Sequence, residues 1–79
     1  MEIQEIIIER EESSTYCGIL TFLHSHEQQL LTWSFQWGDG QKVILMLYPS
    51  THSGENAGVI QSHYRELADA ILGEVFRRV

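Results

Sequence analysis

Hydrophobic and polar residues alternate along residues 30–37, which read LLTWSFQW. One side of an extended chain there carries the large apolar residues Leu31, Trp33, Phe35 and Trp37. The other side carries Leu30 followed by Thr32, Ser34 and Gln36. A period of two with polar residues on one side predicts an antiparallel strand that is half buried.

The next apolar stretch, residues 41–48, is different because both of its faces are apolar. Val43, Leu45 and Leu47 fall on one face, and Ile44, Met46 and Tyr48 fall on the other. Between the two stretches lies Gly38-Asp39-Gly40, and two β-rich segments around a glycine turn indicate a β-hairpin. Pro49 has no N–H for the ladder, so the second arm should end there.

Two further strands are predicted before this hairpin. Residues 2–10 contain four isoleucines, whose branched side chains favour extended structure. Residues 15–23 form the second strand, in which Gly18 marks either a bulge or the close approach of another backbone. The polar stretches 9–14 and 24–29 are short connections, and successive strands joined by short connections predict a four-stranded antiparallel meander.

After residue 58 the period of the apolar residues changes from two to 3.6, which predicts a helix from about Val59 to Arg78. Gly73 lies inside this helix, and one use for it would be close contact with the sheet. The apolar stripe of the helix must cover one face of the sheet. The predicted fold is therefore α+β (ββββα), as one domain over residues 1–79.

One helix covers one face, yet the first, second and fourth strands offer apolar residues to both faces. An apolar face that its own chain does not close is normally closed by another chain, most simply by a second copy in a twofold dimer. We therefore expect a non-catalytic protein-binding module, such as a regulator, an inhibitor, an immunity-type protein or an accessory subunit. The expected contact residues on this second face are Ile19, Ile44, Met46 and Tyr48.

Acidic residues outnumber basic ones by eleven to five, which gives a net charge of −6. This charge argues against direct binding of nucleic acid, which needs a basic patch. Glu5, Glu9 and Glu11 should share one face of the first strand and could give specificity, as could the glutamine-rich stretch 24–29. The acids could imitate a phosphate backbone, but protection of a sheet edge from aggregation is the favoured interpretation.

Candidate chemistry is sparse. His24 and His26 would share one face of a strand and could both reach a metal ion, so a metal-binding or small-ligand-binding domain is the alternative function. The single Cys17 suits a small buried residue better than a nucleophile. We expect no catalytic residue and no cofactor.

The aromatic residues Trp33, Phe35 and Trp37 could form a stacking platform, but core packing beneath the helix is the favoured interpretation. The lone cysteine excludes a disulfide framework within the chain, and no apolar run reaches the length of a membrane span. The first residues, MEIQE, do not resemble a signal peptide, so the cytosol is the expected location.

Overall fold

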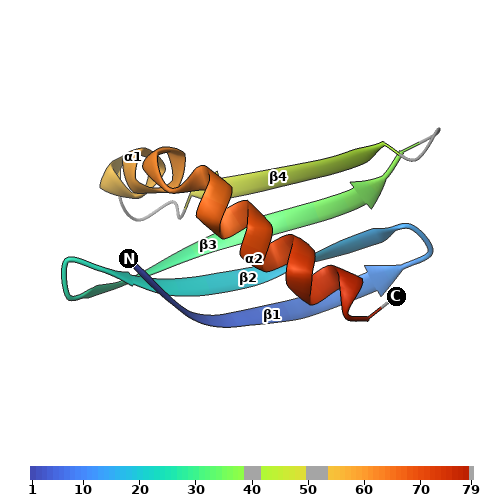
Figure 1. Ribbon diagram of the computed structural model, residues 1–79, viewed down its shortest axis with the longest axis horizontal. Coiled ribbons are helices and arrows are strands. Elements are labelled where there is room, and N and C mark those ends of the chain that lie inside the picture. The colour runs from blue at the N-terminus through green and yellow to red at the C-terminus, as the bar shows by residue number, and fades with distance from the viewer. Residues whose placement is uncertain (39–41, 50–53, 79) are drawn as a thin grey trace.

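The computed structural model describes residues 1–38, 42–49 and 54–78, with the backbone alone at 54–56. In these residues four strands are followed by two helices (Figure 1). The elements are β1 (Glu2–Glu12), β2 (Thr15–His24), β3 (Glu27–Trp37), β4 (Val43–Pro49), α1 (Gly54–Ser62) and α2 (Tyr64–Phe76). The predicted α+β class is confirmed.

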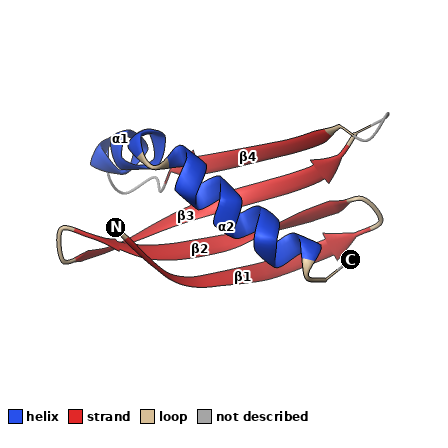
Figure 2. Cartoon of the chain, in the orientation of Figure 1, coloured by secondary structure: helices blue, strands red, loops and turns tan. Residues whose placement is uncertain are grey.

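The strands form one antiparallel sheet in the order β1-β2-β3-β4, so each pairs with its neighbour in the sequence (Figure 2). The predicted meander is therefore correct. Its first two connections are shorter than the polar stretches suggested, because the strands extend into them. Ser25 and His26 alone turn the chain between β2 and β3, with φ of 52° and 66°. Positive φ at both central residues matches the twist of a tight hairpin.

The central hairpin is also present. The N–H of Gly38 donates to the carbonyl of Lys42 at 2.5 Å, and β4 ends at Pro49 as predicted. The turn residues Asp39 and Gly40 lie outside the described residues. The register between β3 and β4 has no irregularity, from Trp37 opposite Val43 to Leu31 opposite Pro49.

The helical region is present, but it is two helices where the sequence predicted one. The break is at His63, whose φ of −114° and ψ of 22° are not helical. The N–H of His63 still donates to the carbonyl of Val59 at 3.1 Å, and that of Leu67 donates to the carbonyl of His63 at 3.0 Å. The chain thus changes direction without losing these hydrogen bonds, and the apolar period alone does not reveal the change.

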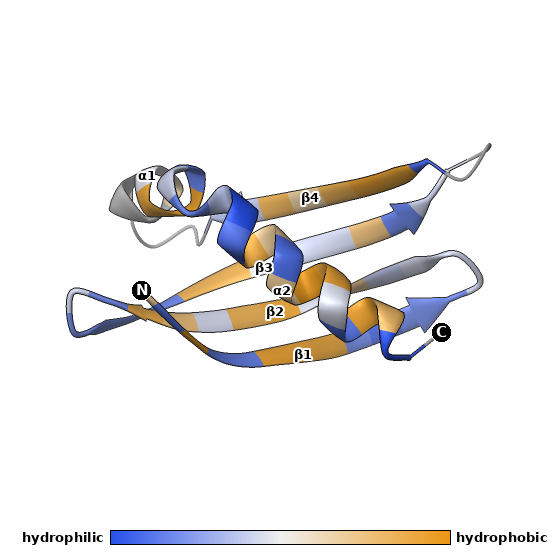
Figure 3. Cartoon of the chain, viewed as in Figure 1, coloured by the Kyte–Doolittle hydropathy of each residue, from blue (hydrophilic) through white to orange (hydrophobic). Residues whose placement is uncertain are grey.

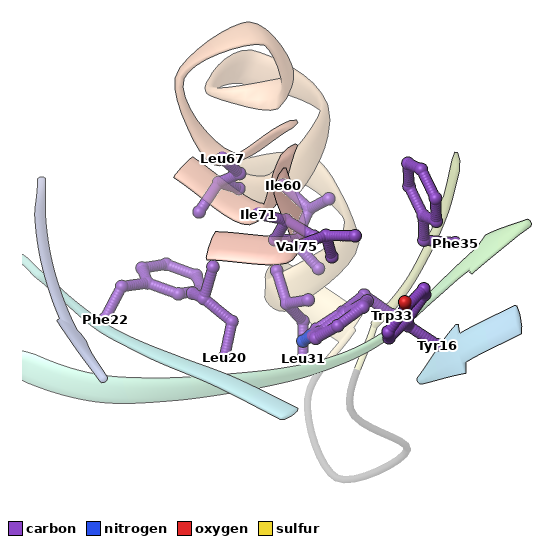
Figure 4. Close-up of a cluster of buried hydrophobic side chains, with 10 residues drawn as sticks. All are labelled: Tyr16, Leu20, Phe22, Leu31, Trp33, Phe35, Ile60, Leu67, Ile71 and Val75. Carbon is purple, nitrogen blue, oxygen red and sulfur yellow. The ribbon is translucent and has the colours of Figure 1, made fainter. Parts of the chain in front are cut away.

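The core lies between α2 and one face of the sheet. The buried side chains of α2 are Leu67, Ala68, Ile71 and Val75. They cover the large residues of β2 and β3, which are Tyr16, Leu20, Phe22, Leu31, Trp33 and Phe35 (Figure 4). Core packing is therefore confirmed for Trp33 and Phe35. Trp37 is half-buried at the margin, with its ring centroid 5.7 Å from that of Phe76.

Two glycines have different surroundings. A Cβ on Gly18 would collide with the carbonyl oxygen of Ile7 and lie 2.9 Å from its carbonyl carbon. The predicted close approach of another backbone at Gly18 is correct. The expected contact between Gly73 and the sheet is wrong, because Gly73 is exposed and a Cβ there would meet nothing within 4 Å.

Candidate protein-contact surface

The face of the sheet turned away from α2 is the candidate contact surface, and we call it the open face. Residues directly opposite each other in an antiparallel ladder point to the same side, so the register assigns its members. They are Glu2, Glu5, Ile7, Arg10 and Glu12 of β1; Thr15, Cys17, Ile19, Thr21 and Leu23 of β2; Gln28, Leu30, Thr32, Ser34 and Gln36 of β3; and Ile44, Met46 and Tyr48 of β4.

The open face combines exposed apolar residues with uncharged polar ones. Five large hydrophobic side chains on it are between 40% and 49% exposed: Ile7, Leu30, Ile44, Met46 and Tyr48. In Figure 3 most of β4 and the middle of β1 are coloured as hydrophobic, as is much of α2. Such a grouping of exposed apolar side chains is typical of a surface that contacts another molecule.

Charge is absent from most of the open face. Its residues on β2, β3 and β4 contain no Asp, Glu, Lys or Arg among the described positions, although one fifth of the chain is charged. The charged members are Glu2, Glu5, Arg10 and Glu12, which all lie on β1 at one margin of the sheet. The structure therefore separates an uncharged surface from an acidic margin.

Three of the four predicted apolar contact residues lie together on β4. Ile44, Met46 and Tyr48 point to the open face, and the Tyr48 hydroxyl donates to the Met46 sulfur at 3.3 Å. Ile19 is half-buried in the middle of the face, between Ile7 of β1 and Thr32 of β3. The register thus brings all four predicted residues onto one surface.

The prediction that Glu5, Glu9 and Glu11 share one strand face is wrong. The register of β1 against β2 shifts twice, between Ile3 and Glu5 and between Ile8 and Arg10. Each extra residue reverses the alternation that follows it. Glu5 therefore lies on the open face opposite Thr21, Glu11 lies on the helix side opposite Tyr16, and Glu9 has no partner in the ladder.

Sequence reasoning missed Ile7 and Leu30 as members of this surface. Ile7 stands between two isoleucines that point to the core, and only the register shows which of the three faces outward. The sequence did contain a signal for Leu30, because it is the one large apolar residue on the polar side of its strand. It lies opposite Thr21 and is 40% exposed.

The histidines are arranged differently from the prediction. His26 is in the turn after β2, so it does not share a strand face with His24. The ring of His24 instead lies beside that of His63, with 5.8 Å between centroids. Within the described residues, no group of three or more His, Cys, Asp or Glu side chains could hold a metal ion.

A hollow of about 380 Å³ lies beside the junction of α1 and α2. It is lined by Ser62, His63, Arg65, Glu66 and Asp69. All of these except the half-buried His63 are exposed. Water is therefore not excluded from the hollow, which limits the strength of any polar interaction made there.

No family model matches the chain, and neither curated proteins nor solved structures show a significant similarity to it. Across the residues that the structure describes, no helix combines the length and the apolar character that a membrane span requires.

Proposed function

We propose that the protein is a non-catalytic protein-binding module that acts through its open face, and that the first occupant of this face is a second copy of the chain. The observation that carries the proposal is an open sheet surface with five exposed large apolar residues and charges on one margin only. A regulator, an inhibitor or an accessory subunit would each use such a surface. A cytosolic location, where thiols stay reduced, suits the single Cys17.

Charge does not prevent a second copy from meeting this face. Two chains of net charge −6 repel each other at long range, so they can associate only where their charges are kept apart. The open face on β2, β3 and β4 contributes no charge to the contact. The acidic residues of β1 can remain at the rim, where water screens them.

The size of the sheet also fits a weak dimer. Four strands spaced about 4.8 Å apart, with roughly seven residues each at 3.4 Å, give about 460 Å² of sheet area per copy. Two copies would bury about 900 Å², which is close to the roughly 1,000 Å² at the lower limit for a specific interface. Face-to-face sheets pack about 10 Å apart, so α2 of each copy would lie on the outside.

Sedimentation velocity over a dilution series tests the proposal. We expect the apparent mass to rise with concentration from the 9.1 kDa of one chain toward twice that value. The variant Leu30→Glu places a charge on the open face of β3, and the cost of burying an unpaired charge should remove association through this face.

A matched control is Gln61→Glu, which adds the same charge at an exposed position of α1. This variant should associate like the original chain. A monomer at every concentration, or equal loss of association in both variants, would reject the open face as the contact surface.

A further inference from the structure

The two edge strands of the sheet are protected to very different degrees. β1 has charged residues at six of its eleven positions and two register shifts, both of which discourage pairing with another strand. β4 reads VILMLYP, with no charged residue and a regular register. Among the described residues, no strand pairs with the outer side of β4 (Figure 1).

Two hydrogen bonds determine which backbone groups of β4 point outward. The N–H of Trp37 donates to the carbonyl of Ser14 at 2.9 Å, so Trp37 faces β2. The next N–H, of Gly38, donates to the carbonyl of Lys42 and faces β4. Bonded pairs alternate along an antiparallel ladder, which makes Ile44, Met46 and Tyr48 the residues of β4 that bond to β3.

The N–H and carbonyl groups of Val43, Leu45 and Leu47 therefore point away from β3, toward the unpaired outer edge of the sheet. The position of Pro49 agrees with this assignment. Pro49 is two residues after Leu47, so its backbone points the same way, and the N–H that proline lacks is one that β3 does not need. The outer side of β4 is thus a row of donors and acceptors with apolar side chains on both faces.

We propose that the β4 edges of two copies pair with each other as antiparallel strands. A twofold axis perpendicular to the sheet would join the two four-stranded sheets into one continuous sheet, with both α2 helices on the same side. Placing Met46 opposite its counterpart pairs all seven residues of β4, and alternation then gives about six hydrogen bonds.

Two features favour a second copy at this edge. β4 is apolar on both faces, so the strand that lies beside it must be apolar on both faces as well, and β4 itself meets that condition. The acidic edge β1 lies at the far side of the sheet. Edge pairing through β4 therefore keeps the two acidic edges as far apart as the sheet allows.

Edge pairing is independent of the proposed function, because it uses backbone groups of β4 and leaves the open face uncovered. It is tested in the Leu30→Glu background, where association through the open face is removed. Amide hydrogen exchange then measures each N–H of β4 in dilute and in concentrated samples.

The expected result is an alternation. The N–H groups of Ile44, Met46 and Tyr48 should be protected at both concentrations because they bond to β3. Those of Val43, Leu45 and Leu47 should exchange fast in dilute samples and become protected in concentrated ones. Fast exchange of these three groups at both concentrations overturns the proposal.

A second measurement uses Val43→Pro, which removes an outward N–H from each copy at the first residue of β4. We expect the dissociation constant of the edge dimer to rise about tenfold to a hundredfold, as for two lost hydrogen bonds. Val43→Ala keeps the N–H and should retain the dimer. Equal dissociation constants for the two variants overturn the proposal.

The two contact surfaces are distinguishable in the same series. If Leu30→Glu alone makes the chain monomeric, the open face is supported and edge pairing is rejected. If Leu30→Glu still dimerises and the added Val43→Pro weakens that dimer, edge pairing is supported. The open face is rejected if Leu30→Glu associates as strongly as the original chain.

Discussion

Gly18 and Gly73 both lie inside regular elements, but only Gly18 is in contact with another part of the backbone. Gly18 is opposite Ile8, next to the second register shift of β1, and the carbonyl of Ile7 occupies the space of its missing Cβ. Gly73 lies on the exposed side of α2 with open space around it. The same substitution should therefore have opposite effects at the two positions.

Replacing Gly18 with Ala should destabilise the protein by about 3 kcal/mol, because the backbone of β1 must move away from the new methyl group. Thermal unfolding followed by circular dichroism measures the effect, with a fall in the melting temperature of roughly 10 °C or more expected for a domain of this size. An unchanged melting temperature would mean that β1 does not approach β2 this closely.

Replacing Gly73 with Ala should stabilise the protein by about 1 kcal/mol, since alanine loses less backbone entropy in a helix and meets no neighbour here. The variant also serves as the control for Gly18→Ala in the same unfolding experiment. Destabilisation by Gly73→Ala would contradict its exposed position on α2.

At the scale of elements, most of the fold could be predicted from periodicity. The strict alternation from Leu31 to Trp37 and the change of period after residue 58 predicted β3 and the helical region correctly. The element that was misread is β1. Its two extra residues reverse the alternation without leaving a glycine or proline as a signal, so the faces of Glu5 and Glu11 could not be assigned from the sequence.

The candidate contact surface could likewise be predicted only where its strands pair regularly. Ile44, Met46 and Tyr48 lie on a strand with a regular register, so counting by two was sufficient. Pairing of His24 with His63 joins residues far apart in the sequence, and no local pattern indicates it. The break at His63 was hidden because the apolar stripe continues from α1 into α2 on both sides of it.

The contribution of α2 to stability depends on its buried side chains. Ile71 is fully buried against the sheet, and its replacement by Ala should cost about 3 kcal/mol through lost burial and a residual cavity. Tyr64 begins the same helix but is 46% exposed, so Tyr64→Ala should change stability by only about 0.5 kcal/mol. Urea unfolding of the two variants makes the comparison, and equal losses would contradict the packing of α2.

At the scale of the whole molecule, the chain separates its charged residues from the open face. The acids of β1 lie along one margin, while the open face on the other three strands and the outer edge of β4 contain no charge. A domain of this size buries only roughly 60–65% of its extended surface, so association would add apolar burial that a single copy lacks.

This separation predicts how salt affects self-association. Raising the ionic strength should leave the dimer unchanged or strengthen it, because salt screens the repulsion between two chains of charge −6 and weakens no ion pair at an uncharged interface. Sedimentation equilibrium at low and high sodium chloride concentration measures the dissociation constant. A dimer that salt dissociates would indicate that charged contacts hold it together.

The most direct test of the open face is an intermolecular NOE experiment on a mixture of ¹³C-labelled and unlabelled chains. We expect NOEs between copies at the methyl groups of Ile7, Ile19 and Leu30, which lie on β1, β2 and β3 and not at the β4 edge. Intermolecular NOEs confined to α2, for example at the exposed Tyr64, or the absence of intermolecular NOEs in concentrated samples, would contradict contact through the open face.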